Sequence, residues 1–113
     1  MSNCIFCKII DGEIPSAKVY EDELIYIFKD IEPQVKVHLL AIPKKHITSL
    51  DELTAEDEQA IGHIFSTVAK LSEEFGITEG YRVISNCKDH GGQTVGHVHF
   101  HVLGGEKLPM NII

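Results

Sequence analysis

The chain has little positive charge, no long apolar run and only three cysteines. Each of these features argues against a class of protein. Ten Lys and Arg residues stand against 17 Asp and Glu residues, which gives a net charge of −7. General nucleic-acid binding needs basic side chains that displace counterions along the phosphate backbone. We therefore expect no nucleic-acid partner, although one nucleotide can still be held by aligned N–H groups and a few histidines.

Membrane insertion and a disulfide framework are also not expected. No stretch reaches the ~18 consecutive apolar residues of a membrane span, and the first residues lack the pattern of a signal peptide. Three cysteines without an export signal argue against a disulfide framework. We expect a cytoplasmic protein. Its 113 residues, 43% of them hydrophobic, suit a single domain over 1–113 with one modest core.

What the chain does contain is a run in which histidine alternates with apolar residues three times, from His97 to Leu103. A period of two predicts a β-strand that places the three imidazoles on one face and the apolar residues on the other. At a rise of ~3.4 Å per residue, His97 and His101 are too far apart for all three to bind one metal ion. Neutral imidazoles near pH 7 can act as nucleophile, base or acid, which favours phosphoryl chemistry.

The remaining patterns predict an α+β domain. Thr54 and Asp57 form a capping box before a long amphipathic helix that ends at Gly76, and His63 on that helix is interpreted as structural. A short helix and five strands that pair mostly as neighbours complete a five-stranded antiparallel sheet with one long and one short helix. The short helix is predicted over 4–10, and the strands over 19–20, 24–28, 37–42, 82–86 and 97–103.

The alternating run matches the pattern His-φ-His-φ-His-φ-φ, where φ is apolar, of the histidine triad family of nucleotide hydrolases and transferases. The chain resembles the Hint-like branch of that family, and the resemblance covers nearly the whole chain up to Gly105. It implies a HIT-like fold and a homodimer in which two subunits join their sheets. The short tail after Gly105 has no tryptophan and departs from the animal Hint proteins. Further matching segments are 5–10, 28–31, 38–46 and 91–94.

The resemblance implies that His99 is the nucleophile. It attacks the α-phosphorus of a purine nucleotide of the AMP or GMP class, and water then hydrolyses the nucleotidyl-histidine. His97 and His38 are implied as supporting catalytic histidines. His101 and Asn86 are implied to hold phosphate oxygens.

The resemblance also implies the residues that meet the rest of the substrate. Gln93 and Thr94 would contact the bridging or leaving atom, and Asp30 would accept hydrogen bonds from the ribose hydroxyls. The competing interpretation of Asp30 is a turn residue before Pro33. An apolar slot for the purine is implied, and two of its members, Ile9 and Ile31, are equally well explained as core residues. The slot comprises Ile5, Phe6, Ile9, Phe28 and Ile31.

Cys4 and Cys7 form a Cys-x-x-Cys motif with three interpretations. They are two buried thiols, a redox motif that here lacks the usual βαβ context, or half of a zinc site. Two thiolates and two imidazoles make a closed tetrahedral zinc site, and zinc-bearing relatives take one ligand from the first histidine of the triad. We therefore expect a structural zinc on Cys4, Cys7, His46 and His97, and no organic cofactor.

Three functions remain open at this point. The first is a hydrolase of purine nucleoside phosphoramidates, similar to an adenosine 5′-monophosphoramidase. The second is a dinucleoside polyphosphate hydrolase, and the third is a nucleotide-binding regulatory protein without catalysis. The Hint-like segments favour the first, because a purely binding role gives no reason for the middle histidine.

Overall fold

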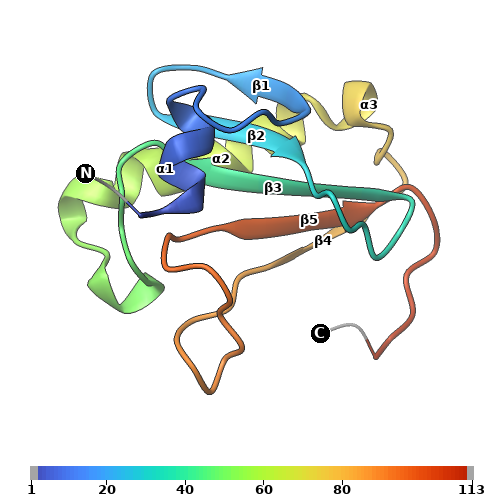
Figure 1. The fold of residues 1–113 in the computed structure, drawn as a ribbon. Helices are drawn as coiled ribbons and strands as arrows, with labels where there is room; N and C mark the ends of the chain where they lie inside the picture. The colour runs from blue at the N-terminus through green and yellow to red at the C-terminus, as the bar shows by residue number, and fades with distance from the viewer. Residues whose placement is uncertain (1–2, 112–113) are drawn as a thin grey trace.

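A five-stranded antiparallel sheet forms the centre of the protein in the computed structural model, which describes residues 3–111 (Figure 1). The order of its strands is β1-β2-β3-β5-β4, so β5 lies between β3 and β4. The α+β architecture expected from the sequence is confirmed. The strands are β1 (Lys18–Glu21), β2 (Ile25–Lys29), β3 (Val37–Pro43), β4 (Tyr81–Ile84) and β5 (Phe100–Gly104).

The two main helices cover opposite faces of this sheet (Figure 1). One face of β2 and β3 packs against Ile64 and Val68 of α2 (Glu58–Lys70). The other face packs against Phe6 and Ile9 of α1 (Ile5–Ile10). Because strand side chains alternate, neighbouring residues of β2 and β3 are divided between two apolar cores.

The predicted long helix is interrupted, so the chain has more short helices than expected. The capping box of Thr54 and Asp57 is present, but it starts a 3₁₀ turn, η2 (Ala55–Asp57), ahead of α2. Leu71 then leaves helical geometry, with φ −102° and ψ 14°, and α3 (Ser72–Phe75) follows as a separate turn. Gly76 ends it in the left-handed region, at φ +78°, which glycine adopts without strain. A further 3₁₀ turn, η1 (Leu50–Glu52), was not predicted.

The histidine run enters the sheet later than its alternation predicts. β5 begins at Phe100, so His97 to His99 form an extended segment before the strand. The reason lies in β3, which ends at Pro43 and has no backbone N–H there to continue the ladder. The N–H of Val98 instead donates to the carbonyl of Ile47 at 2.7 Å. The strand predicted over 82–86 likewise ends at Ile84, so Asn86 follows it.

His63 has a structural role, as expected for a histidine beside the apolar stripe of α2. Its Nε2 bonds Asp22 Oδ2 in the β1–β2 turn. Tyr20 donates to the same oxygen at 2.6 Å, and the N–H groups of Leu24 and Ile25 donate to Oδ1. These bonds attach the first hairpin to α2. Across residues 3–111, none of the helices has both the length and the apolar character to cross a bilayer.

Candidate active site and metal cluster

The three histidines of the run lie on the face of the sheet that α1 covers. The apolar residues that alternate with them belong to the core on the α2 face. Phe6 of α1 contacts two of the rings edge-on, with centroid distances of 5.9 Å to His97 and 5.2 Å to His99. The rings of His99 and His101 are 5.2 Å apart. The alternation therefore produces a row of imidazoles beneath α1.

His99 is buried and has one fixed hydrogen bond. Its Nδ1 lies 2.8 Å from the carbonyl oxygen of His97. A carbonyl can only accept, so Nδ1 carries a proton and donates it. In the neutral ring the lone pair is then on Nε2, the nitrogen that is available to attack an electrophile.

His101 has the opposite arrangement, and His38 is the cause. His38 Nδ1 accepts from the backbone N–H of Gln34 at 3.0 Å, so a neutral His38 carries its proton on Nε2. That Nε2 lies 2.9 Å from His101 Nδ1 and 3.3 Å from Asp30 Oδ2. His101 Nδ1 therefore accepts, and the proton of His101 is on Nε2.

The rings of His38 and His101 are both neutral at pH 7. Burial lowers the pKa of His101 to about 4, and the neighbouring rings of His99 and His38 act in the same direction. Burial also lowers the pKa of His38, against the opposing effect of Asp30. The row thus presents a lone pair at His99 next to an N–H donor at His101.

Cys4, Cys7, His46 and His97 converge at the N-terminus of α1, as the sequence predicts, and could hold a metal ion. Their ligand atoms all lie within 4.8 Å of one another. The Cys4 and Cys7 sulfurs are 3.4 and 3.7 Å from His97 Nδ1, and Cys7 Sγ is 3.3 Å from His46 Nδ1. Zinc bonds of ~2.3 Å to sulfur and ~2.05 Å to nitrogen imply S···N edges of about 3.6 Å in a tetrahedron. We call these four residues the Cys/His cluster.

The hydrogen bonds around His97 suit metal binding. Its Nε2 lies 2.9 Å from the carbonyl oxygen of Pro43, so Nε2–H donates and the Nδ1 lone pair faces the two sulfurs. Burial lowers the pKa of His97, which keeps that lone pair free of a proton. The Cys/His cluster therefore has a correctly oriented ligand before any ion binds.

Asp30, His38 and His101, the Asp/His cluster, also place their ligand atoms within 4.8 Å of one another. Here the orientation is wrong for a metal. The Gln34 N–H occupies His38 Nδ1, so the nitrogen that faces the cluster carries a proton instead of a lone pair. The hydrogen bonds thus distinguish a group that could hold a metal from a group that carries a proton.

The residues expected to form the purine slot divide into two sets. Phe6, Ile9 and Phe28 are buried together beneath α1, with the rings of Phe6 and Phe28 edge to face at 5.7 Å. Ile5 is 45% exposed and Ile31 is 92% exposed, so neither is a core residue. The core alternative therefore fits Ile9 and does not fit Ile31.

The polar residues expected at the phosphate and ribose occupy different environments. Asn86 is half-buried just beyond β4, and Thr94 is exposed. Thr94 shares an open hollow with Cys4 and Ile5. Asp30 does initiate a turn, because its Oδ1 accepts from the N–H of Glu32 at 2.9 Å, while Oδ2 faces His38.

Gln93 braces the loop between β4 and β5. Its Nε2 donates to the carbonyls of Thr48 and Val95 at 2.7 and 2.9 Å, and its Oε1 accepts from the N–H of Lys88 at 2.7 Å. Both ends of the amide are therefore engaged by the protein itself. The loop that carries Thr94 is held in one conformation by this side chain.

Gly104 and Gly105 are required by the packing around the end of β5. A Cβ at Gly104 would lie 2.7 Å from Ile77, and one at Gly105 would lie 2.7 Å from Val37. Gly105 also adopts φ +84°. The two glycines let the end of β5 pass between neighbouring elements.

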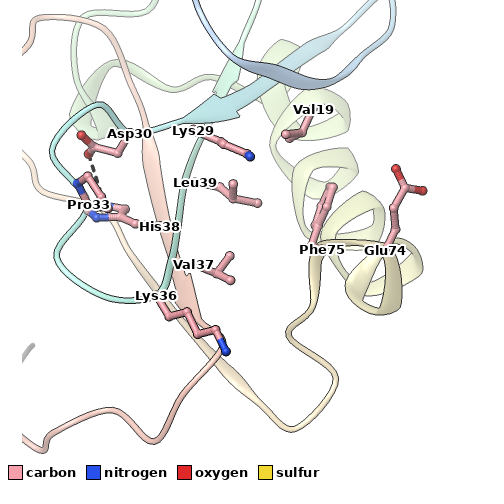
Figure 2. A pocket seen from close by; sticks show the side chains of 10 residues that line it. All are labelled: Val19, Lys29, Asp30, Pro33, Lys36, Val37, His38, Leu39, Glu74 and Phe75. Atoms are coloured by element: carbon pink, nitrogen blue, oxygen red, sulfur yellow. Dashed lines mark ion pairs between the residues drawn. The ribbon is translucent and has the colours of Figure 1, made fainter.

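The cavity in Figure 2 has a volume of about 410 Å³ and is lined by residues from both sides of β3. Val37 and Leu39 line it together with Val19 and Phe75, and Asp30 and His38 line it from the opposite side of the strand (Figure 2). Its rim carries Lys29, Lys36 and Glu74. The cavity therefore reaches Asp30 and His38 of the Asp/His cluster, whereas His99 and His101 do not line it.

Two groups that define the site were not identified from the sequence. They are the carbonyl of Pro43, which orients His97, and the N–H of Gln34, which orients His38. Both belong to the backbone, and any residue type can supply a carbonyl. A pattern of residue types therefore contains no signal for them.

The sequence model of the HIT domain family matches residues 11–108 of this chain. The chain belongs to the HIT domain family. This HIT domain is 50% identical over 105 residues to the purine nucleoside phosphoramidase of Escherichia coli K12, covering 92% of this chain and 88% of that protein. It is also 50% identical over 104 residues to an uncharacterised HIT-like protein of Synechococcus elongatus, covering 92% and 91%.

Solved structures show the same fold. A HIT family hydrolase from Clostridium thermocellum superposes with a TM-score of 0.93 at 45% identity, covering 100% of this chain and 99% of that one. A HIT family hydrolase from Legionella pneumophila gives a TM-score of 0.91 at 43% identity, covering 96% and 98%. The HIT-like fold expected from the histidine run is therefore confirmed, and these relatives support a nucleotide hydrolase.

Proposed function

We propose that this HIT domain hydrolyses purine nucleoside phosphoramidates through a nucleotidyl-histidine on His99. The observation that supports this most directly is the pairing of opposite tautomers on one face: a lone pair on His99 Nε2 beside an N–H donor on His101 Nε2. An attack on phosphorus needs the first, and the charge that develops on phosphate oxygens needs the second. The similarity to a named purine nucleoside phosphoramidase supports the substrate class.

The reaction proceeds in two displacements. His99 Nε2 forms a bond to the α-phosphorus, the phosphorus–nitrogen bond of the substrate breaks, and the leaving amine takes up a proton relayed from solvent by the Thr94 hydroxyl. Water then attacks the same phosphorus and releases a proton to solvent, the bond to His99 breaks, and a nucleoside monophosphate leaves. His101 Nε2–H and Asn86 donate to the phosphate oxygens in both steps. Gln93 keeps the loop that carries Thr94 in place.

The purine lies in the apolar slot beneath α1, against Phe6, Ile9 and Phe28. Two exposed side chains close over the base when it binds: Ile5, which precedes Phe6, and Ile31, which follows Phe28 by three residues. Asp30 Oδ2 accepts from the ribose hydroxyls, while Oδ1 maintains the turn. The ligand is thus a mononucleotide of the AMP or GMP class.

Zinc is the metal we assign to the Cys/His cluster. Two thiolates and two imidazoles are the donor set of closed structural zinc sites, and their spacing fits a tetrahedron. When bound, zinc supplies folding free energy by joining the N-terminus of α1 to the loop after β3. Since all four donors are protein side chains, its role is structural.

We also propose a homodimer that joins two sheets through β4. This strand is at the edge of the sheet, where its outer backbone groups can pair with a further strand. Tyr81 on β4 is 39% exposed and Met110 in the tail beside it is 85% exposed. Burial of such apolar side chains against a second copy supplies the driving force.

The substrate proposal is tested by comparing three compounds. The protein is assayed with adenosine 5′-phosphoramidate, diadenosine tetraphosphate and AMP. We expect hydrolysis of the phosphoramidate at least about tenfold faster, per kcat/KM, than of the dinucleotide. Faster hydrolysis of the dinucleotide favours the alternative hydrolase, and AMP binding without hydrolysis of either compound favours the regulatory alternative.

The covalent step is tested with His99→Ala. The variant should lose turnover by at least about 10³-fold, because the nucleophile is removed. It should still bind AMP, since the slot and the other donors remain. His90→Ala, at an exposed histidine in the loop after β4, is the matched control and should keep full turnover. Turnover of His99→Ala within a few fold of the unmutated protein would exclude the mechanism.

A further inference from the structure

The loop between β2 and β3 is fixed by hydrogen bonds from its own backbone. The N–H of Glu32 donates to Asp30 Oδ1 at 2.9 Å, and the N–H of Lys36 donates to Glu106 Oε2 at 2.6 Å. Between these two anchors lies Pro33, the residue before Gln34, whose own φ is fixed by its ring. The loop is exposed, yet its backbone conformation is set from both sides.

With the loop held in this way, the N–H of Gln34 points toward the ring of His38. It donates to His38 Nδ1 at 3.0 Å, while the Gln34 side chain is turned away and donates to the Glu32 carbonyl at 3.2 Å. His38 itself is buried, with its ring against that of His101 at a centroid distance of 5.2 Å. The contribution of Gln34 to the site is therefore its amide and not its side chain.

Two groups favour a proton on His38 Nε2: the Gln34 amide, which occupies Nδ1, and the Asp30 carboxylate, which lies 3.3 Å from Nε2. If His38 carried its proton on Nδ1, two N–H groups would face each other at 3.0 Å, and the hydrogen bond from Gln34 would be lost. The cationic form of His38 is excluded for the same reason, because it too has a proton on Nδ1. With the proton on Nε2, His38 donates to His101 Nδ1, and His101 keeps its own proton on Nε2.

We propose that the backbone N–H of Gln34 is a positioning group for catalysis, which fixes the proton of His101 on Nε2 by acting through His38. The proposal rests on the function proposed for His101. Without the amide, His38 and His101 can exchange tautomers together, and the lone pair of His101 then faces the phosphate in a fraction of molecules. A phosphate oxygen facing a lone pair loses its donor, so that fraction is inactive.

Imidazole nitrogen NMR tests the proton positions directly in the unmutated protein. In ¹⁵N-labelled protein at pH 7, His38 and His101 should each have an unprotonated Nδ1 and a protonated Nε2, and His99 should have the reverse. Assignment uses single His→Gln variants. A proton on His38 Nδ1 would overturn the proposal without reference to any activity.

Two variants separate the amide from the side chain. Gln34→Pro removes the N–H, and Gln34→Ala keeps it while removing the side chain. In Gln34→Pro we expect both rings to show a tautomer mixture and kcat for the phosphoramidate to fall about tenfold, with AMP affinity changed less than threefold. Gln34→Ala should match the unmutated protein in both measurements. Equal behaviour of the two variants would overturn the proposal.

The outcomes distinguish this proposal from the proposed function. Absence of phosphoramidate hydrolysis in the unmutated protein contradicts the function, whatever the tautomers are. Full hydrolysis with a proton on His38 Nδ1 contradicts only the role of Gln34. If Gln34→Pro does not fold, a proton on His38 Nδ1 in the unmutated protein would still overturn the proposal.

Discussion

The Cys/His cluster and the Asp/His cluster have similar ligand spacing but opposite chemistry. Each brings potential ligand atoms within 4.8 Å of one another, and each contains a histidine of the alternating run. In the first cluster a carbonyl binds the far nitrogen of His97, which turns a lone pair toward the centre. In the second an N–H binds the far nitrogen of His38, which turns a proton toward the centre.

This difference teaches that residue type and spacing do not by themselves define a metal site. Histidine ligands depend on the partner of the nitrogen that does not bind the metal. A carbonyl partner prepares the ring as a ligand, and an N–H partner prepares it as a donor. The same rule gives His99 its lone pair, since its Nδ1 donates to a carbonyl.

The largest effect is expected from disrupting the Cys/His cluster. The unmutated protein, purified without chelator or a metal-affinity column, should contain about one zinc per chain and not two, because the Asp/His cluster lacks a facing lone pair. Cys4→Ser should lower the zinc content below about a tenth of that value and lower Tm. Elemental analysis and thermal unfolding measure both. Cys87→Ser is the control, since Cys87 is outside the cluster, and a zinc loss there would contradict the assignment.

A smaller effect is expected from changing the Asp/His cluster. Asp30→Asn keeps an oxygen for the turn to Glu32 but removes the negative charge that we propose binds the ribose. A charge-assisted hydrogen bond contributes about 1.5–3 kcal/mol, so AMP affinity should fall about tenfold or more. Affinity for 2′-deoxy-AMP should fall less, and zinc content should not change. Calorimetric titration measures the two affinities, and an unchanged ratio between them identifies Asp30 as a turn residue only.

The smallest effect concerns a histidine paired with a carboxylate instead of a backbone group. Burial acts to raise the pKa of Asp22, but hydrogen bonds from Tyr20, His63 and two backbone N–H groups outweigh it and hold that pKa well below its usual range. A lowered pKa contributes stability above the unfolded value near 4, and this contribution is lost as the pH falls below it. Asp22→Asn should therefore reduce the free energy of unfolding by about 1–2 kcal/mol at pH 7, allowing for partial exposure.

Urea unfolding at pH 7 and pH 3 checks this expectation. The gap between Asp22→Asn and the unmutated protein should narrow at the lower pH. Asp89→Asn, at an exposed aspartate in the loop after β4, is the control and should leave the unfolding free energy unchanged. A gap that widens at pH 3 would contradict the role given to the Asp22 carboxylate.

The sequence predicts the sheet, the shared face of the histidines and the Cys/His cluster because these depend on residue type and period. It misplaces the start of β5, which depends on the missing N–H of Pro43 in a different strand. It leaves open whether Ile31 is a core residue, and the structure exposes it because the loop after β2 turns at Asp30. The proton positions in His38 and His101 depend on a backbone amide, which no residue pattern records.

His97 contributes its side chain to the Cys/His cluster and its backbone carbonyl to the orientation of His99. The imidazole faces Cys4 and Cys7, whereas the carbonyl oxygen orients His99. Every residue type has that carbonyl, so a substitution at position 97 removes one side chain of the Cys/His cluster and retains the acceptor for His99. The two functions that we propose for this region, metal binding and catalysis, therefore depend on different atoms of one residue. A lineage can lose the two cysteines while His99 keeps the same orientation.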